Sequence, residues 1–291
     1  MFGECHAHVI MDGKNYREAV DLHRNGVQDE VIHRVFRVCK EKGIRFIRDG
    51  GDALGVSERA RLLAPLYGID YRTPVFAIHK RGHYGSIVGK GFESLSEYHK
   101  LVLEARRRGA DFVKIMTTGI LDFRANGGVT GEMLSAGEVR EMIHIAHEEG
   151  MAVMSHTNGA RAVKIALEAG ADSIEHGNYM DEEAIRMLAE SPAVWVPTLV
   201  TVRNLLGCGR YEDEVLLPIM DSAAENLCLA YRLGAAVAAG SDAGAYQVLH
   251  GQGTVEEVEA FFRILGRGEE ISAWMQKGEE RIRARFCREE Q

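Results

Sequence analysis

Short β-rich segments alternate with helical segments along almost the whole chain, and this alternation constrains the fold more than any other feature. The helical segments carry apolar residues at spacings of three and four, as at Ile32, Val35 and Phe36. Strands that alternate with helices predict a parallel sheet, because each helix returns the chain to the starting edge of the sheet. The eight predicted strands are residues 2–8, 44–49, 71–78, 112–117, 152–156, 173–176, 194–200 and 235–240.

Local signals divide the chain at the same places. A serine or threonine followed three residues later by a glutamate predicts a helix start. Such pairs occur at Ser94 and Glu97, Ser135 and Glu138, and Thr254 and Glu257. Glycine predicts a helix end, because the residue after a helix usually adopts a positive φ. The glycines in such positions are Gly43, Gly109, Gly150, Gly170 and Gly234.

The length of 291 residues suits one (β/α)8 barrel, which typically has roughly 250 residues. An open parallel sheet is the alternative, and it usually binds a dinucleotide on a G-x-G-x-x-G loop. The chain has no such loop, because Glu212 stands where the third glycine after Gly207 and Gly209 belongs. We therefore predict an α/β protein with a single TIM barrel over residues 1–291, whose C-terminal helical tail begins at about residue 269.

Charge and cysteine content limit the partners. The net charge is −8 and is spread along the chain, which argues against nucleic-acid and anionic-membrane partners. The N-terminus shows no basic region followed by an apolar run, and no apolar stretch approaches about 20 residues. The five cysteines form no C-x-x-C pair, as is usual for free thiols in a reducing compartment. We expect a cytoplasmic protein that acts on a small-molecule substrate, with a homo-oligomer left open.

Two predicted strands carry residues suited to metal binding. His6 and His8 share one face of the first strand, and two imidazoles at that spacing can ligate one divalent metal. Lys114 lies within an apolar run, where a charged lysine is costly unless its charge is removed or paired. Its neutral amine could react with CO2 to form a carbamate that bridges two metals. The ordinary alternatives are incidental histidines and a lysine paired with a buried carboxylate.

His156, His176 and Asp242 end the fifth, sixth and eighth predicted strands. Alone, each histidine is consistent with a hydrogen-bonded core residue, and Asp242 beside glycines is consistent with a turn residue. Taken with the three residues above, however, all six fall at the C-terminal ends of five strands, where barrel enzymes place their active sites. This joint pattern predicts two Zn²⁺-like ions about 3.5–4 Å apart, because borderline metals suit a nitrogen and oxygen ligand set.

The order and strand positions of these six residues resemble the amidohydrolase superfamily. Residues 48–51, 114–119, 173–177 and 196–200 and His83 look most like its prolidase-like and imidazolonepropionase-related branch. The resemblance covers residues 2 to about 265. It implies that one metal is bound by His6, His8 and Asp242 and the other by His156 and His176, with carboxylated Lys114 as the bridging ligand. It also implies that Asp242 shuttles the proton and that His83 lies near the substrate.

Two features depart from that family's pattern. Members normally carry strands before and after the barrel that form a small β-sandwich, whereas His6 here follows Met1 almost immediately and nothing strand-rich follows residue 270. We therefore expect a barrel that lacks this sandwich. In addition, Asn158 stands where the branch often has a second histidine, which changes a polar group that faces the substrate.

The predicted activity is metal-dependent hydrolysis of an amide-type C–N bond in a dipeptide, an N-acyl amino acid or a cyclic amide. Metal lowers the pKa of bound water to about 7, so a metal-bridged hydroxide would attack the carbonyl and Asp242 would return the proton to the leaving nitrogen. Arg81, Arg124 and Tyr179 are candidates for holding a substrate carboxylate, or else ordinary surface residues. The alternatives are a mononuclear deaminase or cyclic-imidate hydrolase, which needs no bridging lysine, and a non-catalytic relative.

Overall fold

The named strands of the protein pair in parallel, as predicted for a chain of alternating strands and helices. The computed structural model describes residues 2–124 and 127–288. It contains a three-stranded sheet in the order β1-β2-β3 and a seven-stranded sheet in the order β10-β9-β8-β7-β6-β4-β5. The strands are β1 (Glu4–Ala7), β2 (Phe46–Asp49), β3 (Asp70–Arg72), β4 (Ala77–Lys80), β5 (Gly89–Phe92), β6 (Val113–Met116), β7 (Val153–Thr157), β8 (Ser173–His176), β9 (Val194–Val196) and β10 (Ala236–Val237).

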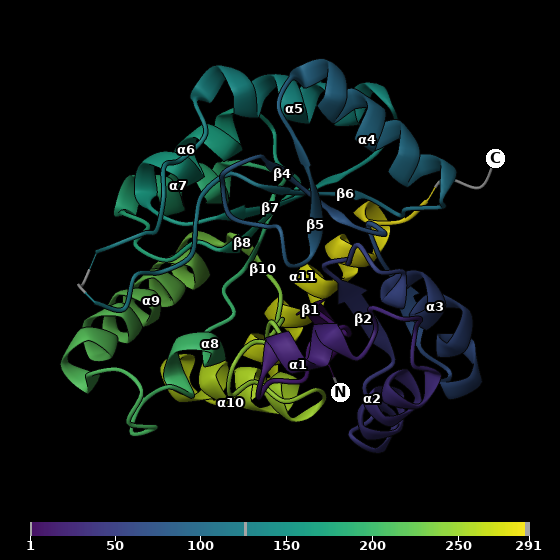
Figure 1. Cartoon of the computed structure of the whole chain (residues 1–291). Helices are drawn as coiled ribbons and strands as arrows, with labels where there is room; N and C mark the ends of the chain where they lie inside the picture. The colour runs from purple at the N-terminus through teal and green to yellow at the C-terminus, as the bar shows by residue number, and fades with distance from the viewer. Residues whose placement is uncertain (1, 125–126, 289–291) are drawn as a thin grey trace.

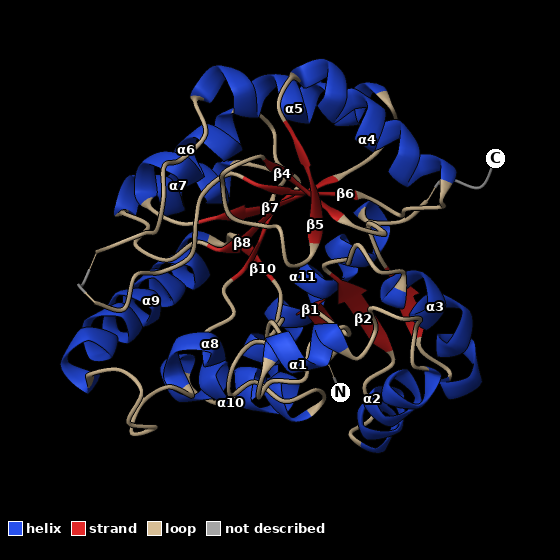
Figure 2. Cartoon of the chain, viewed as in Figure 1, coloured by secondary structure: helices blue, strands red, loops and turns tan. Residues whose placement is uncertain are grey.

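Helices surround the strands, which gather at the centre of the molecule (Figures 1 and 2). The helices are α1 (Tyr16–Asp21), α2 (Asp29–Glu41), α3 (Val56–Leu63), α4 (Leu95–Arg107), α5 (Ala136–Glu148), α6 (Ala160–Glu168), α7 (Glu182–Glu190), α8 (Val200–Arg203), α9 (Asp213–Leu233), α10 (Gln252–Leu265), α11 (Glu269–Arg285) and the short 3-10 helix η1 (Ala64–Tyr67). Within the described ranges, no helix combines the length and the apolar character needed to cross a membrane.

Individual backbone hydrogen bonds join the two sheets. Near β4, the Asp52 N–H donates to the Val75 carbonyl at 2.9 Å. At the other side, the Cys5 N–H in β1 donates to the Ala239 carbonyl at 3.1 Å, beyond the end of β10. The arrangement is consistent with a barrel. Closure into eight continuous strands stays a prediction, as does the lack of a small β-sandwich.

The strand predicted at residues 71–78 is wrong in extent, because the chain changes sheets within it. β3 and β4 occupy its two ends and belong to different sheets. Pro74 between them lacks the N–H group that a central strand requires. Val75 has a φ of 69°, which is incompatible with an extended strand. The Thr73 hydroxyl accepts a hydrogen bond from the Val75 N–H at 3.0 Å and thereby stabilises this bend.

The last two predicted strands are shorter in the structure, with β10 limited to Ala236–Val237, and one observed strand was not predicted. The strand predicted at residues 194–200 ends at Val196, and its last predicted residue, Val200, begins α8. β5 was not predicted, because its sequence Gly-Lys-Gly-Phe lacks the β-branched residues that usually mark strands. It lies at the edge of the seven-stranded sheet and pairs with β4.

Two of the three predicted helix starts are confirmed. Ser94 and Ser135 cap α4 and α5, and the pair at Ser135 forms a complete capping box. The start predicted at Thr254 is wrong, because α10 begins before this residue. Thr254 instead donates a hydrogen bond to Glu4, and Glu257 accepts bonds from backbone N–H groups at the start of α8. The five glycines predicted to end helices all have positive φ.

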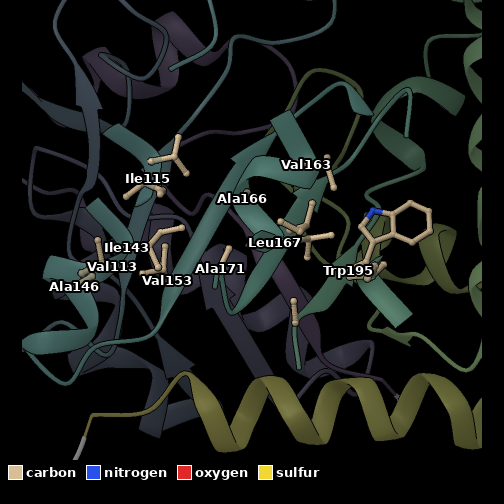
Figure 3. Close-up of a cluster of buried hydrophobic side chains, with 14 of the residues drawn as sticks. Val113, Ile115, Ile143, Ala146, Val153, Val163, Ala166, Leu167, Ala171 and Trp195 are labelled. Carbon is tan, nitrogen blue, oxygen red and sulfur yellow. The ribbon is translucent and has the colours of Figure 1, made fainter. Parts of the chain in front are cut away.

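The largest hydrophobic cluster lies between the seven-stranded sheet and its helices. Val113 of β6 and Val153 of β7 pack with Ile143 and Ala146 of α5 (Figure 3). Burying one large aliphatic side chain contributes about 1.5–3 kcal/mol. This packing therefore fixes the positions of β6 and β7, and these two strands carry part of the candidate site.

α11 packs against the N-terminal ends of the strands. Its residue Ile282, together with Phe286, lies in one buried cluster with Phe46 and Phe112, which start or precede β2 and β6. The Glu279 carboxylate accepts a hydrogen bond from the Gly3 N–H at 2.7 Å. The helix thus covers the end of the strands opposite to the candidate site.

Candidate metal centre

The six predicted metal ligands converge at the C-terminal ends of the strands. Because the strands are parallel, these ends lie at one edge of the sheet. The residues come from β1 or directly after it, from β6, β7 and β8, and from the segment after β10. We call these six residues the cavity floor: His6, His8, Lys114, His156, His176 and Asp242.

His6, His8 and Asp242 form one compact group. One potential ligand atom from each lies within 4.8 Å of the others. The Asp242 Oδ1 atom is 3.6 Å from Nε2 of both histidines. The Lys114 Nζ atom lies 2.8 Å from the His6 Nε2 atom, so the lysine reaches the same point. This group is the better-formed half of the predicted site.

His156 and His176 form the other half. Their ring centroids are 4.6 Å apart, and the His176 ring is 5.1 Å from the His6 ring. The His156 Nε2 atom lies 3.0 Å from the Gly119 carbonyl, and the His176 Nδ1 atom lies 2.7 Å from the Thr198 hydroxyl. Each ring therefore keeps one nitrogen without these contacts, as a metal ligand requires.

The residues present fit a transition metal. Burial lowers the pKa of His6, His8 and His176 well below the usual value and that of His156 to about 4, so the imidazoles are neutral. Neutral imidazole is the form that binds metal. The buried His8 Nδ1 and Asp242 Oδ1 atoms have no hydrogen-bond partner among the described residues. An unpartnered buried carboxylate oxygen is costly, and a cation would remove this cost.

Burial also shifts the pKa of Lys114 and Asp242 toward the neutral forms. It lowers the pKa of Lys114 to about 8 and raises that of Asp242 to about 7. The charges of the two groups partly offset both shifts. A neutral Lys114 amine is the form that the predicted carbamate requires.

A buried ion pair lies beside the His6 ring. The Arg48 Nη2 atom donates to both oxygens of Glu175, at 2.8 and 3.0 Å, and both side chains are fully buried. The Glu175 Oε2 atom is in turn 2.8 Å from the His6 Nδ1 atom, although it lacks the alignment of a hydrogen bond. A carboxylate at the far nitrogen of a metal-binding histidine orients the ring. This role was not predicted from the sequence.

Glu4 connects the backbones that carry His6 and Asp242. Its Oε1 atom accepts hydrogen bonds from the Ser241 N–H at 2.7 Å and the His6 N–H at 3.1 Å. Its Oε2 atom accepts from the hydroxyls of Ser241 at 2.5 Å and Thr254 at 2.6 Å. Glu4, Arg48 and Glu175 are charged residues inside apolar strands, as Lys114 is, and this signal could have identified all of them.

The backbone at the cavity floor is locally unusual. His176, Thr198 and Asp242 have φ values of 67°, 51° and 58°, which non-glycine residues rarely adopt. A Cβ atom on Gly50 would lie 2.2 Å from the His8 Cε1 atom, so only glycine leaves room for this ring. Such conformations persist where the surrounding structure enforces them, and they are concentrated at functional sites.

A cavity of about 590 Å³ opens above the cavity floor. His8, Lys114, His156, His176 and Asp242 line it, while His6 lies behind them. The Tyr84 ring stands 5.1 Å from the His156 ring. Apolar side chains form much of the wall: Met11, Ile87, Val88, Met116, Ile120, Leu121, Phe123 and Leu205. The volume and the mixed lining suit a small organic molecule.

The residues predicted to contact substrate are not among the described residues that line this cavity. His83 is half-buried, its Nδ1 atom is 3.1 Å from the Glu132 carbonyl, and it lines a different pocket. Arg81 pairs with Glu93, and Arg124 pairs with Asp122.

Tyr179 packs into a hydrophobic cluster, and its hydroxyl has no partner among the described residues. The cationic side chains that line the cavity outside its floor were not predicted, because they lie in loops or near loop ends without any motif. We call them the cavity rim: Lys14, Arg17 and Arg210.

Sequence relatives align with part of the chain. No protein-family model matches it. An uncharacterized protein of Mycobacterium tuberculosis is 29% identical over 178 residues, which cover 59% of this chain and 47% of that protein. Ochratoxinase of Aspergillus niger is 26% identical over 155 residues, which cover 52% of this chain and 32% of ochratoxinase. The chain thus spans about half the length of these relatives or less.

Solved structures share the fold. The crystal structure of A. niger ochratoxinase superposes with a TM-score of 0.74 at 20% identity, over 94% of this chain and 68% of that chain. A Xaa-Pro dipeptidase with methionine bound in its active site superposes with a TM-score of 0.69 at 22% identity, over 94% of this chain and 75% of that chain.

Proposed function

We propose that this chain, whose structural neighbours are amidohydrolase-superfamily members and whose sequence homologues include ochratoxinase, is a metal-dependent hydrolase of amide-type C–N bonds. These relationships confirm the resemblance to the amidohydrolase superfamily that the motifs predicted. The observation that carries the proposal is the convergence of the cavity floor beneath a cavity of about 590 Å³. We also infer that the two sheets close into one (β/α)8 barrel, which the hydrogen bond from Cys5 to Ala239 supports.

We assign two divalent ions to the cavity floor, with Zn²⁺ as the expected metal and other divalent transition metals as substitutes. His6, His8 and Asp242 would hold the first ion, and His156 and His176 the second. Lys114, carboxylated at its neutral amine, would be the bridging ligand. The 2.8 Å approach of the Lys114 Nζ atom to the His6 Nε2 atom supports this assignment, because it brings the lysine to the ligand atoms.

The chain's own residues supply proton transfer and positioning. Bound divalent metal polarises a carbonyl and lowers the pKa of water to about 7. Asp242 would take up a proton at its carboxylate and deliver it to the leaving nitrogen. Glu175 and Glu4 hold His6 and the Asp242 segment in place.

A mononuclear deaminase or cyclic-imidate hydrolase is the second candidate function. It is favoured by one observation, that His6, His8 and Asp242 already form a compact ligand group whereas His156 contacts a backbone carbonyl. The two candidates differ in metal content. Two equivalents per chain support the binuclear amide hydrolase, and one supports the alternative.

The decisive experiment is a substrate screen on metal-loaded protein whose metal content has been measured by elemental analysis. The substrates are dipeptides, N-acyl amino acids, lactams and hydantoins. We expect two equivalents of metal and turnover of at least one class, abolished by chelation and restored by Zn²⁺. Two bound metals without turnover of any class would overturn the amide-hydrolase proposal but spare the metal site. Failure to bind any transition metal would favour a non-catalytic relative.

A further inference from the structure

We propose that helix α10 positions both halves of the cavity floor through the side chains of Thr254 and Glu257. This inference rests on the proposed metal centre and assigns two positioning residues to it. Thr254 and Glu257 are three residues apart on α10, and both side chains are buried. Their spacing is that of a capping box, yet both side chains bond to groups outside α10.

Glu257 acts on the half of the floor that contains His176. Its two carboxylate oxygens accept hydrogen bonds from the Leu199 and Val200 N–H groups, both at 2.9 Å. These groups directly follow Thr198, whose hydroxyl lies 2.7 Å from the His176 Nδ1 atom. A histidine that binds metal through one nitrogen donates from the other, and the acceptor orients its ring. Glu257 therefore fixes the position of that acceptor.

The backbone that carries Thr198 depends on such contacts. Its φ of 51° lies in the left-handed region, which a β-branched residue rarely adopts unless its surroundings enforce it. Helix α8, which begins two residues later, lies beside α10 (Figure 1). At the far end of α8, the Asn204 side chain donates to the Glu256 carboxylate of α10 at 2.7 Å. The segment that carries Thr198 is thus attached to α10 at both ends of α8.

Thr254 acts on the other half of the floor through Glu4. Its hydroxyl donates to the Glu4 Oε2 atom at 2.6 Å. The same carboxylate accepts from the His6 and Ser241 N–H groups, so it joins β1 to the segment after β10. α10 comes close to this point, because a Cβ atom on Gly253 would lie only 2.9 Å from the Ser241 Oγ atom. The glycine therefore permits the approach that brings Thr254 to Glu4.

One helix thus contacts the supports of both proposed ion sites. Residues three apart lie on the same face of a helix, so α10 fixes the spacing of the two supports as well as their individual positions. That spacing matters for a binuclear centre, whose ions lie about 3.5–4 Å apart. A bridging ligand such as carboxylated Lys114 can bind both ions only if the two halves keep this separation.

The test is Zn²⁺ titration of metal-free protein by chelator competition, which gives a dissociation constant for each equivalent. His156→Ala removes a ligand of the second ion and identifies the equivalent that belongs to it. We expect Glu257→Gln to raise the dissociation constant of the second ion about 10-fold and to leave that of the first within about twofold. Thr198→Val, which removes only the hydroxyl, should act alike, and Thr198→Ser should restore the affinity. The two losses should be less than additive in the combined variant, because both act through His176.

Thr254→Val should instead weaken the first ion about 3- to 10-fold, since Glu4 keeps its other hydrogen bonds. Glu259→Gln is the matched control, because Glu259 lies on the same helix but pairs with Arg267 on the surface. It should change neither constant. The absorption spectrum of the Co²⁺-loaded protein should shift in Glu257→Gln and stay unchanged in Glu259→Gln.

The outcomes separate this inference from the proposed metal centre. Two bound ions whose affinities are unchanged by Glu257→Gln and Thr254→Val would overturn the inference and retain the centre. Lower stability of Glu257→Gln with unchanged affinity for the second ion would likewise reduce Glu257 to a cap of α8. Glu257→Asp, which keeps both acceptor oxygens, replaces Glu257→Gln if that variant does not fold, and the same selective loss is expected. Fewer than two equivalents in the wild-type protein would overturn the binuclear centre itself.

Discussion

The cavity floor and the cavity rim differ in how firmly the chain holds them. Five of the six floor residues are buried and Asp242 is partly buried. His6 by itself has three polar neighbours, namely Lys114, Glu175 and Asp242. The side chains of the rim are exposed, and Arg210 makes only aromatic contacts among the described residues. A catalytic group must stand within a fraction of an ångström of its target, whereas attraction of a charge tolerates a looser fit. From this difference we infer that the floor carries out the reaction and that the rim selects the substrate.

Replacing Asp242 tests the floor most directly. Asp242→Asn keeps the shape of the side chain but removes its ability to accept a proton, and it weakens metal binding. We expect kcat to fall by about 10³-fold, within the range attributed to general acid–base catalysis. Steady-state kinetics with the metal content of each sample measured will check this. The exposed Asp221 on α9 supplies the control, Asp221→Asn, which should behave like the wild type. A variant that retains its metals and its rate would remove Asp242 from the mechanism.

Lys114→Ala should reduce metal content from two equivalents to about one and lower kcat/KM about 10²-fold, because the bridging ligand is lost. Elemental analysis measures the metal, and the mass of the intact protein under native conditions detects the carbamate. Lys164→Ala is the matched control, since Lys164 pairs with acidic residues on the surface. An unchanged metal content in Lys114→Ala would favour the mononuclear alternative.

The floor was predictable from the sequence, and the rim was not. The floor residues lie within regular strands or in the segments that directly follow them, so the period and order of the strands reveal where these residues lie. Arg210 lies in a loop before α9, and only tertiary packing brings it to Tyr246. A strand position has a definite direction, whereas a loop position acquires one only in the folded chain.

The same reasoning explains why the buried supports were missed. Glu4, Arg48 and Glu175 lie in predicted strands, and a charge in an apolar strand signals a partner. The partner itself cannot be found from spacing, because Arg48 and Glu175 are joined across the interior from β2 and β8. The bend at Pro74 was missed for the opposite reason, since a single proline signal was outweighed by the β-rich residues around it.

Glu175→Gln tests how much the buried ion pair of Arg48 and Glu175 contributes to the arrangement of the cavity floor. We expect metal affinity to fall about 10- to 100-fold. Leaving Arg48 unpaired in the interior should also cost about 3–5 kcal/mol of stability. Chemical denaturation and metal titration measure the two effects. Glu149→Gln, which removes an ion pair with Arg106 near the surface, should cost less than about 1 kcal/mol.

A double variant separates folding from positioning. Arg48→Met with Glu175→Met removes both buried charges, and such replacements are often neutral or stabilising. We expect this protein to regain stability without regaining metal affinity, because nothing then faces the His6 Nδ1 atom. Recovery of metal affinity in the double variant would mean that Glu175 neutralises Arg48 and does nothing more for His6.

The smallest expected effect belongs to the rim residue with the weakest constraint. Arg17 is exposed on α1, and its Nε–H already donates to the Tyr16 hydroxyl at 3.1 Å, so it attracts a substrate anion mainly through its charge. We expect Arg17→Met to lower kcat/KM for an anionic substrate about two- to threefold at low salt. The loss should fade as added salt brings the screening length to roughly 8–10 Å. A larger, salt-independent loss would show direct contact with the substrate, and the rim would then share the close geometry of the floor.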